Sequence, residues 1–151
     1  MKGKDIEITK KACEKFKTTP VSIINFVEGT RFTKDKKERL NSPYKNLLAT
    51  KAGGIAFVLA SMGDQLQSIL DVTIIYPNGN KSFWDFLCGK VKDIKVQVTS
   101  HPITIIPKGD YINDTDYRKD FHQWLNSMWT EKDRYIEEML EQNRQQAAKA
   151  I

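Results

Sequence analysis

The sequence predicts an α/β fold built around a central sheet. Two short apolar runs, Val21–Val27 and Ile69–Tyr76, are rich in β-branched residues and are bounded by chain-breaking residues, which is typical of strands buried on both faces. Segments with helical periodicity precede, separate and follow these runs. The chain has 151 residues, of which 40% are hydrophobic and 28% charged, and this balance suits one globular domain.

The first third of the chain is predicted to run from helix to strand to loop to helix. Asp5–Lys17 places its apolar residues on one stripe and ends before a Thr-Pro pair. The strand Val21–Val27 then leads into a loop at Glu28–Thr33. The charged segment Lys34–Leu40 predicts a short helix or turn, and Leu47–Met62 predicts a longer helix.

The middle of the chain predicts two further extended segments. Ile69–Tyr76 is closed by the turn signal Pro77–Gly79, and Lys81–Cys88 predicts one or two helical turns. Asp93–Ser100 alternates between apolar and polar residues, as a strand with one exposed face does, and Ile103–Ile106 is predicted to extend it.

The C-terminal part is predicted to hold two helices. From Asp114 onward an apolar stripe recurs with helical spacing, and Thr130–Asp133 resembles a capping box that would open a second helix. The polar, alanine-rich tail Gln142–Ile151 is predicted to fray.

The positive charge is concentrated in the first third. Residues 1–51 hold 13 lysines and arginines against 6 aspartates and glutamates, a local charge of +7, whereas residues 52–151 carry −2. Such a charge suits nucleic acid, anionic lipid headgroups, a phosphorylated small molecule or a merely solvated face. Nucleic acid is disfavoured, because the basic helix Asp5–Lys17 offers only Phe16 for stacking and its stripe places that ring inward.

Several classes of protein are disfavoured by simple counts. The two cysteines, Cys13 and Cys88, have no metal-type spacing and favour a reducing compartment over a disulfide-stapled secreted module. The nearly apolar run Ala52–Met62 is about half the ~20 residues that a membrane-spanning helix needs. Met1–Asp5 lacks the apolar core of a signal peptide.

The strand Val21–Val27 ends in Glu28-Gly29-Thr30-Arg31. Gly29 lets a ligand approach the backbone closely, Thr30 offers a hydroxyl, and the planar Arg31 guanidinium matches phosphate oxygens in pairs. Glu28 suits either the orientation of Arg31 or the acceptance of a ligand hydroxyl. On pattern alone, a charged turn is an equally good interpretation.

A second anion-binding element follows in the chain. Lys51-Ala-Gly53-Gly54 opens a helix, whose first turn offers free backbone N–H groups and a positive end. Together with the Glu28–Arg31 loop it predicts a phosphate site.

These segments resemble blocks of the glycerolipid acyltransferase family, which includes the 1-acylglycerol-3-phosphate acyltransferases. Val21–Thr33 resembles its Glu-Gly-Thr-Arg block, with Val27 in the place of the usual proline. Lys51–Ala60 is similar to the small-residue helix that follows that block, and Leu70–Pro77 to a hydrophobic strand that ends at proline. The resemblance covers roughly residues 3–140 and points to the bacterial branch related to lysocardiolipin and lysophosphatidate acyltransferases.

The resemblance implies a central, mostly parallel sheet flanked by helices and incomplete at its N-terminal side. Residues 1–112 would be the C-terminal part of the acyltransferase domain, and residues 113–151 a helical extension packed on it. The residues implied in binding the phosphate and glycerol of the acceptor are Glu28, Gly29, Thr30 and Arg31, with Lys51 and Gly53 as weaker additions.

The chain departs from the family at the catalytic motif, His-x-x-x-x-Asp, whose histidine takes the proton from the acceptor hydroxyl. His101 is followed five residues later by Ile106, and His122 by Ser127. The family's second block is missing as well. We therefore expect no catalytic residue and no metal site here, and we expect the chain to be the C-terminal part of a longer enzyme and inactive alone.

Other conspicuous residues have simpler interpretations. His101 is predicted at a surface or edge, and His122 in helix packing. Trp124 and Trp129 suit either a lipid-contacting belt or packing against the sheet, and packing is favoured. A solvated helix face is predicted for Glu137, Glu138 and Glu141.

The implied reaction is acyl transfer from acyl-CoA or an acyl-carrier protein to the free hydroxyl of a lysophospholipid such as 1-acylglycerol-3-phosphate, without a further cofactor. The expected partners are this acceptor, the thioester donor and a membrane surface, with no nucleic acid. The longer protein is expected at the cytoplasmic face of the bacterial inner membrane, and the piece itself is expected to be soluble and to self-associate. The alternative is a non-catalytic phospholipid-binding or scaffolding module.

Overall fold

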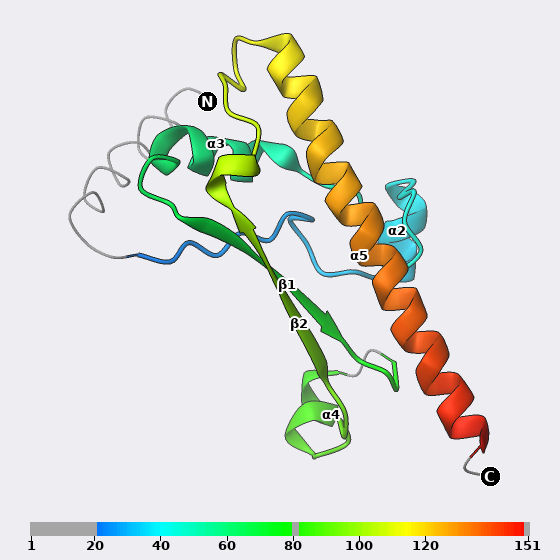
Figure 1. Ribbon diagram of the computed structural model, residues 1–151. Coiled ribbons are helices and arrows are strands. Elements are labelled where there is room, and N and C mark those ends of the chain that lie inside the picture. The colour runs from blue at the N-terminus through cyan, green and yellow to red at the C-terminus, as the bar shows by residue number, and fades with distance from the viewer. Residues whose placement is uncertain (1–20, 80–81, 150–151) are drawn as a thin grey trace.

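The computed structural model describes residues 21–79 and 82–149. The predicted helix Asp5–Lys17, including Cys13, lies outside these residues. The elements follow in the order α2 (Lys34–Arg39), α3 (Ala52–Met62), β1 (Ser68–Ile75), α4 (Phe83–Leu87), β2 (Lys95–Pro102), the 3-10 turn η1 (Ile103–Ile105) and α5 (Thr115–Lys149) (Figure 1).

The short helices form where the sequence supplies caps. The Thr33 hydroxyl accepts the backbone N–H of Lys36 and so begins α2. Ser82 and Asp85 form a capping box at the start of α4. Both helices were predicted, whereas α3 begins at Ala52, five residues later than predicted.

The helix α5 is one continuous element of 35 residues that runs along the whole molecule (Figure 1). Its N-terminus is capped by Asp114, whose Oδ1 accepts the backbone N–H groups of Asp116 and Tyr117. The predicted break at Thr130 is wrong, because the Thr130 hydroxyl bonds the Asn126 carbonyl as it does within a helix. The tail, predicted to fray, is helical as far as Lys149.

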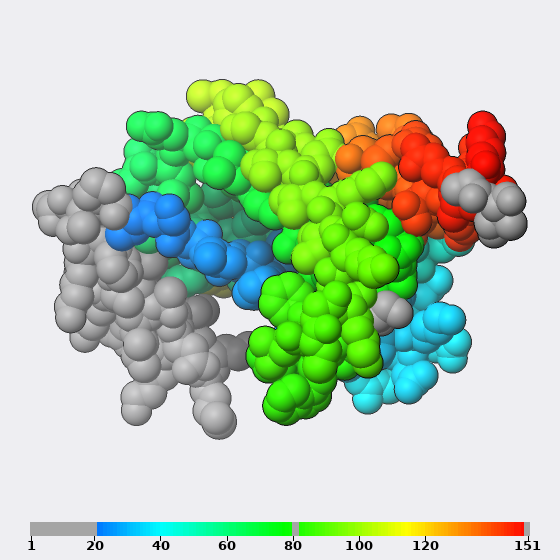
Figure 2. Space-filling view, turned by 90° about the horizontal axis from the view of Figure 1, so that it is seen from below, coloured from blue at the N-terminus to red at the C-terminus, as the bar shows by residue number. Residues whose placement is uncertain are grey.

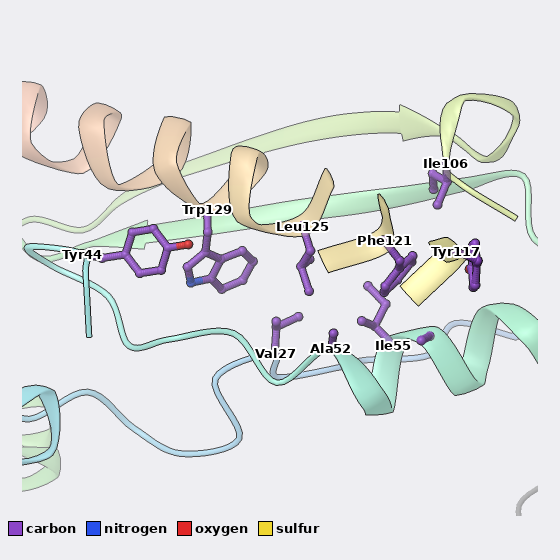
Figure 3. Packing of buried hydrophobic residues seen from close by; sticks show 10 residues of the cluster. Val27, Tyr44, Ala52, Ile55, Ile106, Tyr117, Phe121, Leu125 and Trp129 are labelled. Carbon is purple, nitrogen blue, oxygen red and sulfur yellow. The ribbon is translucent and has the colours of Figure 1, made fainter. Parts of the chain in front are cut away.

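The core lies between α5 and the N-terminal half of the described chain (Figure 3). Every fourth residue of α5 faces inward at the start of the helix, from Tyr117 through Trp129, and this spacing is what a helical stripe requires. The favoured packing of Trp129 is confirmed, since its side chain is buried. Trp124 is partly buried against the same cluster, with its ring centroid 5.4 Å from that of Phe121. The facing members of the cluster are Val27, Tyr44, Ala52, Ile55, Ala56 and Ile106.

The sheet of the described residues has two antiparallel strands, β1 and β2, paired from Ser68 opposite Pro102 to Ile75 opposite Lys95. The long connection between them carries α4 at the far end of the hairpin (Figure 1). Ile103–Ile105 forms the 3-10 turn η1 in place of the predicted strand extension. A mostly parallel central sheet is not seen in this part of the chain and remains a prediction.

The two faces of this sheet are reversed relative to the usual pattern. An outer face made of large apolar side chains is exposed; its members are Leu70, Val72, Ile74, Val96 and Val98. The inner face, directed at the core, carries polar side chains such as Asp71, Thr73 and Gln97 among its isoleucines. The prediction that Ile69–Tyr76 is buried on both faces is therefore wrong.

The segment Val21–Val27 is extended but pairs with neither strand, so the predicted buried strand is not formed there. Val27 alone is buried, while Ile24 and Phe26 are about four-fifths exposed. Figure 2 shows this segment, in blue, running along the surface.

Candidate functional site

The Glu28–Arg31 turn begins where the extended segment reaches the core. The backbone N–H of Gly29 donates to the Phe26 carbonyl at 2.8 Å and closes the turn. Gly29 has φ +68°, and a Cβ at this position would lie 3.0 Å from Lys51 Cδ. Glycine is therefore required both for the left-handed backbone and for the close approach of the Lys51 side chain.

The start of α3 lies beside this turn, as the sequence predicted. The Lys51 N–H donates to the Val27 carbonyl at 2.8 Å, and a Cβ on Gly54 would lie 3.2 Å from Asn25 Nδ2. Among the described residues, no side chain caps the first turn of α3. Gly53 faces open space, with no atom within 4 Å of an added Cβ. The backbone at this helix end is thus accessible to a ligand.

Arg31 and Thr30 differ in their surroundings. Arg31 is exposed, and none of the ion pairs found between described residues includes it. The Thr30 hydroxyl accepts the Lys36 ammonium at 2.7 Å, and the same ammonium donates to the Arg31 carbonyl at 3.3 Å. Lys36 of α2 thereby holds the turn and adds a third cation, after Arg31 and Lys51, to its neighbourhood.

Glu28 points inward and is partly buried. Burial raises the pKa of its carboxyl group, while the backbone N–H of Leu48, the Lys132 charge and the Trp129 indole act to lower that pKa. The indole nitrogen makes no hydrogen bond within the usual distance, so its influence on Glu28 is electrostatic at longer range. The pKa of Glu28 is therefore sensitive to α5, which carries Lys132 and Trp129.

Two residues of this region were missed by the sequence analysis. Lys132 of α5 is only 7% exposed and forms a buried ion pair with Asp71 of β1. Its ammonium also lies 4.7 Å from the centre of the Trp129 ring. A usable signal existed, because Asp71 is the one charged residue inside the apolar run Ile69–Tyr76.

The two histidines lie away from the turn in different settings. His122 Nε2 is 2.8 Å from the Tyr111 hydroxyl, and its ring packs beside that of Tyr111, which confirms helix packing as its role. His101 lies on the inner face of β2, and its Nε2 is buried without a hydrogen-bond partner in the part of the chain that the structure describes. The prediction of an edge strand for His101 is confirmed within the described two-stranded sheet, but the prediction of a surface side chain is wrong, because the ring is partly buried.

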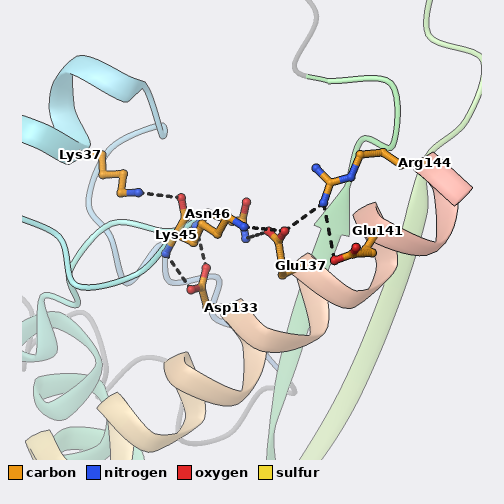
Figure 4. A network of polar contacts seen from close by, with 7 residues as sticks. All are labelled: Lys37, Lys45, Asn46, Asp133, Glu137, Glu141 and Arg144. Carbon is orange, nitrogen blue, oxygen red and sulfur yellow. Dashed lines mark hydrogen bonds and ion pairs between the residues drawn. The ribbon is translucent and has the colours of Figure 1, made fainter.

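Glu137 was predicted to lie on a solvated face but joins a polar network (Figure 4). Its carboxylate accepts the Lys45 ammonium at 2.6 Å, the Asn46 amide at 3.3 Å and the Arg144 guanidinium at 3.0 Å. These contacts lower the pKa of Glu137 to about 2, with the Lys45 hydrogen bond as the largest cause. Asp133, one turn earlier, accepts the backbone N–H groups of Lys45 and Asn46.

Known proteins similar to this chain share one chemistry. The 2-acyl-1-lysophosphatidylinositol acyltransferase of Saccharomyces cerevisiae is 27% identical over 138 residues, which cover 78% of this chain and 32% of that protein. Lysocardiolipin acyltransferase 1 is 26% identical in Mus musculus, over 76% of this chain and 31% of that protein. The Danio rerio form is 23% identical, over 81% and 32%. The chain is similar in sequence to these lysophospholipid acyltransferases.

The chain spans about a third of the length of the curated relatives that it matches. No protein-family model matches it, and no solved structure does. Within residues 21–79 and 82–149, no helix has both the length and the hydropathy that crossing a bilayer requires.

Proposed function

We propose that the chain is the acceptor-binding part of an enzyme that transfers an acyl group from a thioester to the free hydroxyl of a lysophospholipid. The relatives are named for acyl transfer to lysophospholipids. The observation that carries the proposal is the exposed Arg31 guanidinium, free of ion pairs within the described chain, on a glycine turn packed against Lys51.

The acceptor phosphate is proposed to bind at this turn. The Arg31 guanidinium pairs with two phosphate oxygens, and Lys51 and the open N-terminus of α3 at Gly53 add positive charge. Gly29 leaves the backbone close to the ligand, and Thr30 contributes a hydroxyl whose position Lys36 holds. The partly buried Glu28 carboxyl group is proposed to accept a glycerol hydroxyl of the acceptor.

The chain is not proposed to supply the general base. His122 is hydrogen-bonded to Tyr111, and His101 has no aspartate five residues later. A positioned base contributes roughly 10²–10⁴ in rate to such a proton transfer. We therefore expect this chain alone to leave acyl-CoA and acyl-carrier-protein thioesters intact. If a longer protein that contains this chain also fails to turn over acyl thioesters, the non-catalytic phospholipid-binding or scaffolding module becomes the better interpretation.

The mostly parallel sheet belongs to the same proposal. Val21–Val27 is extended with exposed Ile24 and Phe26, and the outer face of β1 and β2 is apolar and exposed. Large apolar faces of this kind are normally covered. We propose that further strands of the acyltransferase domain cover them in the longer enzyme, which works at a membrane surface because its acceptor is a lipid. The bacterial inner membrane remains a prediction.

The test is calorimetric titration of the chain with a short-chain lysophosphatidate. Arg31→Ala should weaken binding about ten- to a hundredfold, because it removes hydrogen bonds to a charged group worth about 1.5–3 kcal/mol. Arg31→Lys should recover little of this affinity, since an ammonium lacks the planar fork. Arg39→Ala, which removes an exposed arginine of the nearby α2, is the matched control. Equal affinity in the Arg31→Ala and Arg39→Ala variants would reject the site.

A further inference from the structure

The end of the β1–β2 hairpin carries an exposed apolar cluster that the acceptor site does not use. This tip cluster consists of Phe83, Trp84, Phe86 and Leu87 of α4, whose exposed fractions lie between 55% and 72%. No residue of α4 is buried. Figure 1 places α4 at the far end of the hairpin from α3, and Figure 2 looks at the molecule from that end.

The side chains of the tip cluster are held by a short helix with defined ends. The capping box of Ser82 and Asp85 fixes the start of α4, and Gly89, with φ +69°, ends it. The rings of Phe83 and Trp84 pack edge to face, with centroids 6.1 Å apart. Pre-ordered aromatic side chains lose little conformational freedom when they enter a new environment.

The charges around the tip cluster favour an anionic surface. Residues 81–95 hold four lysines and two aspartates. Both aspartates are engaged within the tip: Asp85 caps α4 and pairs with Lys90 at 3.1 Å, and Asp93 accepts the Asn78 amide at 3.4 Å. The exposed Lys92 lies beside the apolar cluster in the chain. Aromatic residues with neighbouring lysines are typical of segments that lie at the headgroup level of a bilayer.

We propose that the tip cluster inserts into the surface of an anionic lipid bilayer and docks the protein there. This inference rests on the proposed function, because it places the lysophospholipid-binding protein on the surface that contains its acceptor. The projecting shape of the tip suits insertion among headgroups, whereas the outer face of β1 and β2 suits cover by other protein. The two apolar surfaces therefore have different occupants and can be tested separately.

The experiment is co-sedimentation of the chain with vesicles of phosphatidylcholine and phosphatidylglycerol, and with phosphatidylcholine alone. We expect binding to the anionic vesicles and a loss of tenfold or more in the variant Phe83→Ser/Trp84→Ser, because both rings are withdrawn from the interface. Leu70→Ser/Val98→Ser is the matched control: it removes two similarly exposed apolar side chains from the outer face and should retain the affinity.

A fluorescence measurement adds a readout of insertion. Brominated lipids should quench the tryptophan emission of the vesicle-bound wild type, and Trp84→Phe should abolish this quenching while binding persists, because Trp129 is buried and Trp124 partly so. Absence of vesicle binding, equal loss in the tip and outer-face variants, or a tip variant that alters only self-association would overturn the proposal. The Phe83→Ser/Trp84→Ser variant should bind short-chain lysophosphatidate as the wild type does, so failure of the acceptor site and failure of the docking tip are distinguishable.

Discussion

Glu28 is the residue of the candidate site whose surroundings disfavour its charged form. Burial raises its pKa more than the Leu48 N–H, the Lys132 charge and the Trp129 indole lower it. Residues that lower stability in this way are common at functional sites, where geometry is retained for the ligand. Glu28 is thus expected to shape the candidate site without stabilising the fold at neutral pH.

We expect Glu28→Gln to preserve or increase thermal stability at pH 7. The folded state raises the pKa of Glu28, so it holds the proton to higher pH than the unfolded chain, and stability falls as pH rises through the unfolded value toward the folded one. In the glutamine variant this part of the decline is absent. Thermal unfolding at pH 4 and pH 7, compared between variant and wild type, measures it. A larger loss of stability at pH 7 than at pH 4 would contradict the assignment.

At the scale of the elements, the buried pair of Lys132 and Asp71 joins α5 to β1. Lys132 also donates to the Val72 carbonyl at 3.3 Å and lies over the Trp129 ring. The pair explains why the inner face of β1 tolerates a charge. The same Lys132 ammonium group also lowers the pKa of Glu28, so its charge acts on residues of the strand and of the turn.

Breaking this pair should be costly, whereas removing both charges should not. Lys132→Met leaves the Asp71 carboxylate buried without its cation, and we expect a loss of about 3 kcal/mol in the free energy of unfolding. The double variant Lys132→Met/Asp71→Leu should recover most of that loss, because no unpaired charge remains. Urea denaturation of both single variants and the double variant measures the coupling. Additive losses would show that the two residues act independently.

Glu137 connects α5 to the segment 44–46 that leads toward α3, and its contribution should depend on pH. Its folded pKa of about 2 lies below the ordinary value of 4.5 for a glutamate, so the stabilisation is present above pH 4.5 and is lost as pH falls toward 2. We expect Glu137→Gln to cost about 1 kcal/mol at neutral pH, since its partners are partly exposed.

The matched control is Glu138→Gln, whose carboxylate pairs with Arg134 one turn earlier on the exposed side of α5. It should cost less, about 0.3–0.5 kcal/mol. Chemical denaturation of both variants at pH 7 and pH 2.5 provides the measurement. Equal effects of the two substitutions, or an undiminished Glu137→Gln effect at pH 2.5, would argue against the network.

At the level of the whole molecule, the described residues expose several large apolar side chains on one face of the sheet. Each strand of the two-stranded sheet is paired on one side within the described residues, and the outer face beside these edges is apolar. Unpaired edges with apolar faces recruit another chain. We therefore expect the 151-residue chain to self-associate at micromolar concentrations.

The variant Val72→Lys should reduce this association, because it places a charge in the middle of the outer face. Leu40→Lys introduces the same charge at an exposed leucine next to α2 and should leave association unchanged. Light scattering over a range of protein concentrations distinguishes them. A wild-type chain that is monomeric at every concentration would refute the prediction.

The sequence by itself determined the features that arise within a few residues. The stripe of α5, the caps at Thr33 and Ser82, and the glycine turn at Gly29 depend on helical spacing, local hydrogen bonds and backbone freedom. The same local signals misled at Thr130. A capping box opens a new helix only where the backbone before it leaves the helical conformation, and here it does not. Neither glycine nor proline interrupts residues 115–149.

Only the tertiary structure decided which surfaces are covered and which distant residues meet. Alternation in β2 predicts that one face is buried, but it does not say which one. The ion pair between Lys132 of α5 and Asp71 of β1 places α5 on the polar face of the hairpin. Glu28, Asp71 and Lys132 are brought together from positions more than forty residues apart along the chain. The Lys132–Asp71 ion pair and the effect of Lys132 on the pKa of Glu28 depend on the relative placement of turn, strand and helix, and no local pattern encodes that placement.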